Sequence, residues 1–275
     1  MVKDNVSKGL DFKVLWLLGM HRSGTSLTAN WLHKCGLDMG PSFIKADVGN
    51  VHGYYEDQEI VKFHKEIIRD NNLLNDVQIQ QRLNFSEAHR QTAREIINKR
   101  KALDELIIWK DPRTCLTIDL WNELMPDNVA IILFRHYNEV VDSLVRRKAK
   151  AEKKRRNFIQ GYFNYLTRNK YSKKGYTNSL LESWVHHNKN ILAYIEKKKE
   201  CEYIILSPDQ LQENSIEILE LINTKFRLNL EYYPFEQVFD NSLYKKETPQ
   251  YEYSKDTLDR AEEVLKKLED LKTHQ

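Results

Sequence analysis

The sequence predicts an α/β fold of three layers, in which a parallel β-sheet is flanked by helices. Short apolar runs that suit buried strands recur along the chain, and each is followed by residues with helical spacing. Such strand-helix units join most simply through right-handed crossovers, which make the strands parallel. The 275 residues suffice for one large domain. We expect a single domain over 1–275, with a helical excursion or cover at 146–176 and a C-terminal tail and helix at 231–275.

The first predicted unit is a strand, a glycine-bounded loop and a helix. The continuous apolar run 14–18 is typical of a strand that is buried on both faces. A helix is predicted from Gly24, because apolar residues up to Leu32 recur near one helical face. Gly36 can then supply a left-handed stop, and the glycine-rich, polar stretch 36–53 is predicted to be a loop.

The same patterns predict the remaining elements. Short apolar runs predict three further strands, over 106–109, 129–134 and 202–206. Helical spacing predicts helices over 58–74, 86–106, 178–198 and 257–271, with further helix starts after the third strand and at Ser207-Pro208. Residues 231–254 carry seven aromatic residues and two prolines in an irregular pattern. The tryptophans at 16, 31, 109 and 121 lie in apolar patterns and are predicted to belong to the core.

The loop over 19–26, GMHRSGTS, follows the phosphate-loop pattern G-x-x-x-x-G-K-[ST], except that Thr25 stands where the lysine belongs. The backbone N–H groups of such a loop converge on an anion, and the following helix adds the positive end of its dipole. Positive charge comes from Arg22, whose guanidinium can contact two anionic oxygens. The sequence offers neither the lysine nor a plain Mg²⁺-binding carboxylate, which favours a phosphate-bearing donor handled without Mg²⁺. The alternative is a glycine-rich turn without a ligand.

Two later strands also end in charged residues. The run over 106–109 leads into Lys110-Asp111-Pro112-Arg113, where proline suits the start of a helix. The run over 129–134 leads into Arg135, and Ser143 follows about two turns into the next helix. Since α/β proteins bind ligands at the carboxyl edge of the sheet, Arg135 and Ser143 could flank one anion beside the first loop. The alternative is an arginine that caps the sheet and a serine packed on a helix.

Charge and cysteine content narrow the class of protein. The 43 basic and 40 acidic residues nearly balance, but eight basic residues gather in the run RRKAKAEKKRR over 146–156. For this run we rank a solvated helix face first, steering of an anionic acceptor second and nucleic-acid binding third. The three cysteines, at 35, 115 and 201, suggest neither a disulfide framework nor a zinc site, so we expect a cytoplasmic protein without a bound metal. No apolar run is long enough to suggest a transmembrane helix, and peripheral membrane contact stays open.

These motifs together resemble those of the sulfotransferases that use 3′-phosphoadenosine 5′-phosphosulfate (PAPS), and the bacterial branch fits best. The resemblance rests on GMHRSGTS, on N-x-x-G-Y-Y-E-D over 50–57, on KDPR over 110–113, and on Arg135 with Ser143 in FRHYNEVVDS. It covers roughly residues 12–145, with weaker similarity in SWVHHNKNILAYI and EYIILSPDQL. The resemblance implies a fold like that of the P-loop-containing nucleotide hydrolases.

The resemblance also implies two anion sites for the two phosphate-bearing ends of PAPS. The 5′-phosphosulfate would be bound by Arg22, Ser23, Gly24, Thr25 and Ser26, and the 3′-phosphate by Arg135 and Ser143. Arg22 would also stabilise the charge that develops on the departing phosphate, which makes it a candidate catalytic residue. The product left from the donor would be the 3′,5′-bisphosphate, PAP, and no metal is expected.

The acceptor hydroxyl must lose a proton. Glu56 is our preferred general base, with a glutamate that merely interacts with a helix dipole as the alternative reading. His52 is the second candidate base, since an unperturbed histidine titrates near ~6.5. His21 is a candidate for contacting the acceptor or the donor. The KDPR side chains Lys110, Asp111 and Arg113 are candidates for binding the acceptor, and could instead brace the first loop.

The predicted function is transfer of a sulfuryl group from PAPS to a hydroxyl of a carbohydrate or glycolipid, with no nucleic acid as partner. One alternative is a Mg²⁺-dependent nucleotide kinase with a degenerate phosphate loop. Another is a non-catalytic protein that binds a nucleotide or an anionic polymer. The oligomeric state cannot be read from the sequence.

Overall fold

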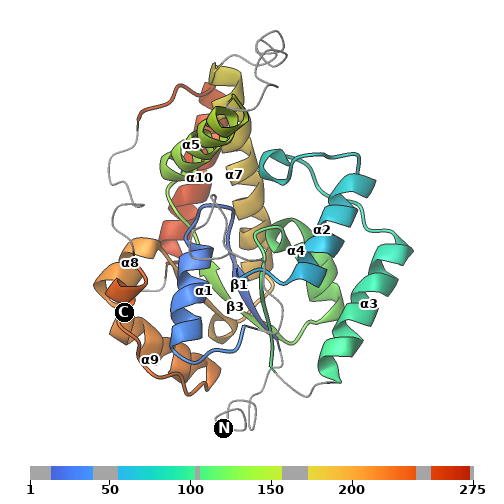
Figure 1. The fold of residues 1–275 in the computed structure, drawn as a ribbon, viewed down its shortest axis with the longest axis vertical. Coiled ribbons are helices and arrows are strands. Elements are labelled where there is room, and N and C mark those ends of the chain that lie inside the picture. Colours follow the sequence, from blue (N-terminus) through green and yellow to red (C-terminus); the bar gives the residue numbers. More distant parts are fainter. Residues whose placement is uncertain (1–13, 40–54, 103–105, 157–172, 240–248, 273–275) are drawn as a thin grey trace.

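The computed structural model describes residues 14–39, 55–102, 106–156, 173–239 and 249–272 (Figure 1). In this part of the chain, four parallel strands form one sheet in the order β2-β1-β3-β4. The strands are β1 (Val14–Leu18), β2 (Ile107–Lys110), β3 (Asn128–Leu133) and β4 (Tyr203–Leu206). The predicted parallel sheet is therefore confirmed, and the three later strands differ from their predicted bounds by one residue.

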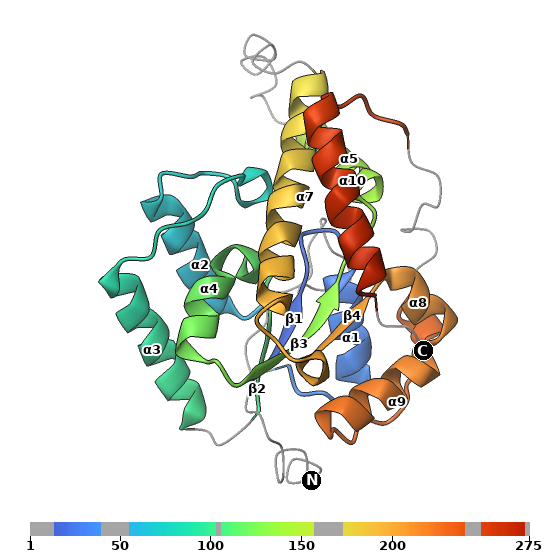
Figure 2. The ribbon, with the colours of Figure 1, turned by 180° about the vertical axis from the view of Figure 1, so that it is seen from behind.

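Helices cover both faces of the sheet, which makes it the middle of three layers (Figures 1 and 2). The helices that share a core cluster with one face are α1 (Thr25–Lys34), α8 (Pro208–Glu213) and α9 (Ser215–Phe226). Those that share a cluster with the other face are α2 (Gln58–Asp70), α3 (Glu87–Lys101), α4 (Thr114–Leu124), α5 (Tyr137–Arg156), α7 (Lys173–Ile195) and α10 (Lys255–Asp270). The three-layer α/β architecture is confirmed.

Strand β1 explains why the two cores lie on opposite faces. Successive side chains of a strand point to opposite faces, so Trp16 joins one cluster while Leu15 and Leu17 join the other. The ring of Trp109 lies 5.7 Å from that of Trp16 and 4.8 Å from that of Trp121. The four tryptophans that were predicted to be core residues are all buried.

The strand order creates a switch point between β1 and β3. From β1 the chain passes to β2 on one side, and from β3 it passes to β4 on the other side. Leu18 at the end of β1 pairs with Ile132 near the end of β3, so the loops that follow these strands begin side by side. In open α/β sheets, ligands bind at the carboxyl ends of strands at such a point.

Several helices differ from their predicted bounds. Helix α2 ends at Asp70 rather than at residue 74, because the Asn71 side chain donates to the Ile67 carbonyl (2.9 Å) and Asn72 takes a left-handed φ of 59°. Helix α3 ends at Lys101, before the predicted 106. Helix α9 was not predicted, since only the start of α8 carried a clear signal.

The basic run 146–156 is the second half of α5. The helix begins at Tyr137, carries Ser143, and continues without a break to Arg156. The chain is thus helical as far as Arg156, and α7 begins at Lys173, five residues earlier than predicted. Residues 157–172 and 40–54, the latter including His52, lie outside the described residues. Among the described helices, none combines the length and the apolar character needed to cross a membrane.

Candidate functional site

The loop between β1 and α1 is held tightly against the end of β3 and the start of α8. Gly19 has a φ of +153°, and a Cβ atom there would collide with the Leu133 carbonyl and lie 2.7 Å from Cγ2 of Thr25. Gly24 has a φ of +95°, and a Cβ atom there would lie 2.9 Å from Cγ of Pro208. Both glycines are needed because the backbone takes left-handed conformations where it passes other atoms closely.

The loop offers donors that an anion would satisfy. The Ser23 side chain is 1% exposed, and its hydroxyl has no hydrogen-bond partner in the described part of the chain. Helix α1 starts directly after Gly24, and the first N–H groups of a helix have no partners within it. A buried, unsatisfied hydroxyl beside a helix N-terminus fits a phosphate or sulfate group.

Arg22 links this loop to the helix that follows β3. Its Nε donates a hydrogen bond to Oγ of Ser143 over 2.8 Å, across the switch point between β1 and β3. Ser143 is buried, whereas Arg22 is exposed and has a left-handed φ of 72°. The structure therefore brings together one residue from each of the two predicted anion sites.

Arg135 lies two residues beyond β3 and is half-buried. Its Nη2 donates to Oε1 of Glu139 (3.0 Å), and its carbonyl accepts from Nε1 of Trp184 (3.1 Å). The first bond holds the guanidinium beside α5, the helix that carries Ser143, and the second holds the Arg135 backbone. A 3′-phosphate at this position would share Arg135 with Glu139.

Lys110 reaches the phosphate loop from the end of the neighbouring strand β2. Its Nζ donates to Oγ of Ser26 (2.8 Å) and to Oε1 of Glu56 (2.9 Å). The side chain is 1% exposed, and burial lowers the pKa of Lys110, while Glu56 opposes this shift. An ammonium group thus stands at the second hydroxyl of the Thr25-Ser26 pair, although the loop itself lacks the lysine.

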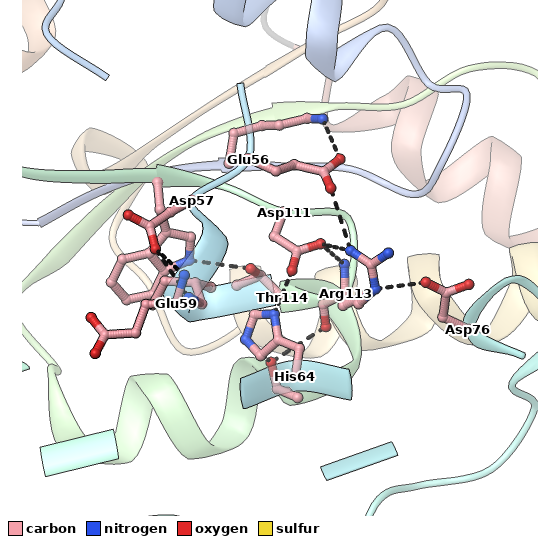
Figure 3. A network of polar contacts seen from close by, with 12 residues as sticks. Glu56, Asp57, Glu59, His64, Asp76, Asp111, Arg113 and Thr114 are labelled. Carbon is pink, nitrogen blue, oxygen red and sulfur yellow. Dashed lines mark hydrogen bonds and ion pairs between the residues drawn. The ribbon is translucent and has the colours of Figure 1, made fainter. Parts of the chain in front are cut away.

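Glu56 is buried between two cations (Figure 3). Besides Lys110, it meets Nη1 of Arg113 at 3.5 Å through Oε2. It does not cap α2, because Asp57 is the N-cap and accepts from the N–H groups of Glu59 (2.9 Å) and Ile60 (3.0 Å). The helix-dipole reading therefore suits Asp57 better than Glu56, whose carboxylate balances charge in the site.

Arg113 and Asp111 form the centre of a buried polar network behind the loop (Figure 3). Nη1 of Arg113 donates to Oδ1 of Asp111 (2.7 Å), Nε of Arg113 pairs with Oδ2 of Asp76 (2.6 Å), and Oδ2 of Asp111 meets Nδ1 of His64 (2.7 Å). Burial alone would raise the pKa of Asp111, but Arg113 and His64 outweigh it and hold that pKa below its usual range. Burial would also raise the pKa of Asp76, but His21 and Arg113 outweigh this effect and lower that pKa.

The predicted acceptor-binding residues divide into two groups. His21 is 8% exposed, lies in the phosphate loop, and has its Nε2 3.5 Å from Oδ2 of Asp76. Lys110, Asp111 and Arg113 are buried and joined to protein partners, which favours the bracing role over contact with an acceptor.

Sequence reasoning missed His64 and Asp76. A signal for His64 was present, because it lies four residues after Ile60 and therefore on the apolar face of α2, where a histidine needs polar partners. Asp76 lies in the short turn after α2 and carried no such signal. Within the described residues, no group of His, Cys, Asp and Glu is arranged to hold a metal ion.

Comparison with solved structures shows which known fold this chain shares. No protein-family model matches the chain, and no curated protein sequence matches it. The sulfotransferase domain from the Synechococcus PCC 7002 olefin synthase superposes with a TM-score of 0.50 and 17% identity, covering 92% of this chain and 94% of that domain. This chain has a sulfotransferase fold. The sulfotransferase domain from the curacin biosynthetic pathway gives a TM-score of 0.50 and 13% identity, covering 91% of this chain and 96% of that one.

The sulfotransferase fold confirms the P-loop-like architecture that the motifs implied. At 13% and 17% identity, the likeness concerns the path of the chain and not individual side chains. The roles of residues in this sulfotransferase fold are therefore argued from the site geometry.

Proposed function

We propose that this protein is a sulfotransferase that moves the sulfuryl group of PAPS to an acceptor hydroxyl. The observation that carries the proposal is the 2.8 Å hydrogen bond between Arg22 and Ser143, which joins the loop after β1 to the helix after β3. A donor with phosphate groups at both ends of its ribose needs two neighbouring anion sites. The sulfotransferase fold supports the same assignment.

The donor would be held by the loop residues Ser23 to Ser26, with the unsatisfied Ser23 hydroxyl facing its 5′ end, and by Arg135 and Ser143 at its 3′ end. When bound, PAPS supplies the activated sulfuryl group. Arg22 stabilises the negative charge that develops on the departing phosphate, as fixed donors do in many transfer reactions. Lys110 holds the Ser26 hydroxyl in place. We propose no metal ion in this chemistry.

We assign removal of the acceptor proton to Glu56, with His52 as the alternative base. Lys110 contacts both Glu56 and Ser26, so the base and the donor loop share one ammonium group. A proton arriving on Glu56 would weaken its ion pairs with Lys110 and Arg113, which leaves more positive charge beside the donor loop as the sulfuryl group departs.

The acceptor would be a hydroxyl of a carbohydrate or glycolipid, with His21 as the loop residue best placed to meet it. The two similar domains belong to an olefin synthase and to the curacin biosynthetic pathway, so a hydroxyl on a biosynthetic intermediate is a second candidate acceptor. The three cysteines are free thiols, which supports the proposed cytoplasmic location.

A thermal-shift screen tests the proposal against its rivals, since a ligand that binds the native state raises stability by mass action. We expect the 3′,5′-bisphosphate to raise the melting temperature in the presence of a chelator. A Mg²⁺-dependent kinase would instead be stabilised by ATP with Mg²⁺ alone. If neither ligand changes the melting temperature, a non-catalytic binder of anionic polymers is favoured. Either this result or stabilisation by ATP with Mg²⁺ alone would overturn the assignment.

A further inference from the structure

A buried polar network extends from helix α2 to the phosphate loop, and His64 at its far end has no part in the function proposed above. We define this His64 network as His64, Asp111, Arg113, Glu56 and Lys110. The exposed fraction is 0% for His64 and Asp111 and 8% at most for the other three residues. Because buried polar groups must be satisfied by one another, the loss of one member affects the next.

The hydrogen bonds of His64 fix its tautomer. The indole Nε1 of Trp121 can only donate, and it lies 2.7 Å from Nε2 of His64, so this nitrogen accepts. The hydroxyl of Thr117 lies 3.1 Å from the same nitrogen. The ring is therefore neutral, with its proton on Nδ1, and Nδ1 donates to Oδ2 of Asp111 over 2.7 Å. His64 acts as a donor to a carboxylate and not as a base.

Asp111 has each oxygen engaged. Oδ2 accepts from His64, while Oδ1 accepts from the backbone N–H of Arg113 (3.1 Å) and from its Nη1 (2.7 Å). Without the His64 proton, Oδ2 would be a buried charged oxygen short of a donor, which is costly. The carboxylate would then turn toward Arg113, the nearest remaining source of N–H groups.

Movement of Arg113 would reach the phosphate loop through three further contacts. Arg113 meets Oε2 of Glu56 at 3.5 Å, and Oε1 of Glu56 accepts from Lys110 at 2.9 Å. Lys110 in turn donates to Oγ of Ser26 at 2.8 Å. Every contact on the path from His64 to the loop involves a charged side chain; the short ones are charge-assisted hydrogen bonds, and the 3.5 Å ion pair between Arg113 and Glu56 is the longest step.

We propose that His64 is a positioning residue for sulfuryl transfer: its Nδ1–H orients Asp111 and, through Arg113, Glu56 and Lys110, fixes the Ser26 hydroxyl of the phosphate loop. The inference rests on the proposed function for its catalytic readout. The physical claim, that His64 orders the loop, also holds for the protein without ligand and can be measured there.

Two amide substitutions separate the two nitrogens of the ring. In His64→Asn the side-chain N–H₂ can take the place of Nδ1 and still donate to Asp111. In His64→Gln the longer side chain reaches the Nε2 position, accepts from Trp121, and leaves Asp111 without its donor. A misplaced group in an active site costs up to about 100-fold. We therefore expect His64→Gln to lower kcat about 10- to 100-fold with little change in the KM for acceptor, and His64→Asn to stay within about threefold of wild type.

Tyr194→Phe serves as a matched control. It removes a buried 2.7 Å hydrogen bond to Oδ1 of Asn128, which lies at the start of β3 and so at the opposite edge of the sheet from the phosphate loop. We expect it to lower the melting temperature as His64→Gln does, while kcat stays unchanged. Should His64→Gln fail to fold, His64→Leu replaces it, because leucine also leaves Asp111 without its donor and suits the apolar surroundings of Phe63 and Trp121.

Amide hydrogen exchange of residues 19–27 without ligand gives the second readout. We expect exchange about tenfold faster in His64→Gln than in wild type, and unchanged rates in His64→Asn and Tyr194→Phe. Equal behaviour of His64→Gln and His64→Asn in this measurement would overturn the inference. If wild type fails to bind the 3′,5′-bisphosphate while the exchange difference persists, the proposed function is wrong and the positioning role stands.

Discussion

Nε of Arg22 and Oγ of Ser143 are 121 residues apart in sequence and 2.8 Å apart in the structure. The bond ties the loop after β1 to the helix after β3 at the switch point of the sheet. It orients an exposed arginine before any ligand arrives, which reduces the conformational entropy that binding must overcome. The bond thus joins one residue of each predicted anion site.

Arg135→Ala should weaken binding of the 3′,5′-bisphosphate about 10- to 100-fold, since hydrogen bonds to charged groups contribute about 1.5–3 kcal/mol. Binding of adenosine 5′-phosphosulfate, which lacks the 3′-phosphate, should change far less. Isothermal titration calorimetry with both ligands measures the difference. Arg147→Ala is the control, because Arg147 lies in the basic run of α5, the helix that follows Arg135. Equal losses for both ligands would contradict the assignment of Arg135 to the 3′ site.

Glu56→Gln should retain bisphosphate binding within about threefold and lower turnover at least about 100-fold, the usual contribution of a general base. The variant should also melt at a lower temperature, because Lys110 and Arg113 lose a buried counter-charge. Steady-state kinetics and calorimetry measure the two effects. Glu59→Gln is the control, since Glu59 follows the N-cap of α2 and pairs with the exposed Lys99. Turnover close to wild type would remove Glu56 from the mechanism.

Gly19→Ala should destabilise the protein strongly and abolish bisphosphate binding, because its Cβ would collide with the Leu133 backbone. Gly36→Ala is the matched control. Gly36 also has a left-handed φ, +102°, but no atom lies within 4 Å of its added Cβ. Its cost should be only the backbone strain, about 1 kcal/mol. Urea unfolding gives the free energy of unfolding of both variants. Equal losses of stability would show that the collision with Leu133 does not contribute.

The buried His187 should make the stability of the protein depend on pH. Burial lowers the pKa of His187 to about 3, although its Nδ1 hydrogen bond to the Ser183 carbonyl opposes the shift. In the unfolded chain a histidine titrates near ~6.5. The unfolded state therefore binds a proton that the folded state does not, so the free energy of unfolding falls as pH drops from about 6.5 toward 3.

His187→Gln should reduce this dependence, while His136 and His186, whose pKa values burial also lowers, keep part of it. Urea unfolding of both proteins between about pH 7 and pH 4.5 measures the difference, because the lowered pKa values of Asp76 and Asp111 make their contributions fade only below about pH 4. His33→Gln, at an exposed position, should keep the wild-type slope. If His187→Gln and wild type lose stability in parallel over this range, the neutral His187 is not a source of the acid sensitivity.

The strands and the phosphate loop could be predicted because their signals are local. A continuous apolar run, two glycines and a helical repeat lie within residues 14–32, and the structure forms β1 and α1 there. The continuation of α5 through the basic run was open in the sequence, since charge alone does not decide whether a helix persists. The early end of α2 depends on two asparagines: Asn71 caps the helix with its side chain, and Asn72 takes a left-handed φ. Helical periodicity predicts neither feature.

The site was harder to predict because its contacts join distant segments. Arg22, Lys110 and Ser143 were each identified from motifs, but the bonds from Lys110 to Ser26 and Glu56 depend on β2 lying next to β1. The sequence gives strands in chain order and not in their order across the sheet. His64 lies on an apolar helix face, where the sequence gives no sign of its partners. Its hydrogen bonds to Trp121 and Asp111 can be seen only in the structure.

The enclosure of Lys110 has a practical consequence for chemical labelling. Amine-reactive reagents need an uncharged, accessible nitrogen, and this one is sealed from solvent by a hydroxyl and a carboxylate. In a mass-spectrometric footprint it should stay unmodified while the exposed Lys148 and Lys150 of α5 react readily. Modification of Lys110 would therefore report that the carboxyl edge of the sheet has become accessible to solvent.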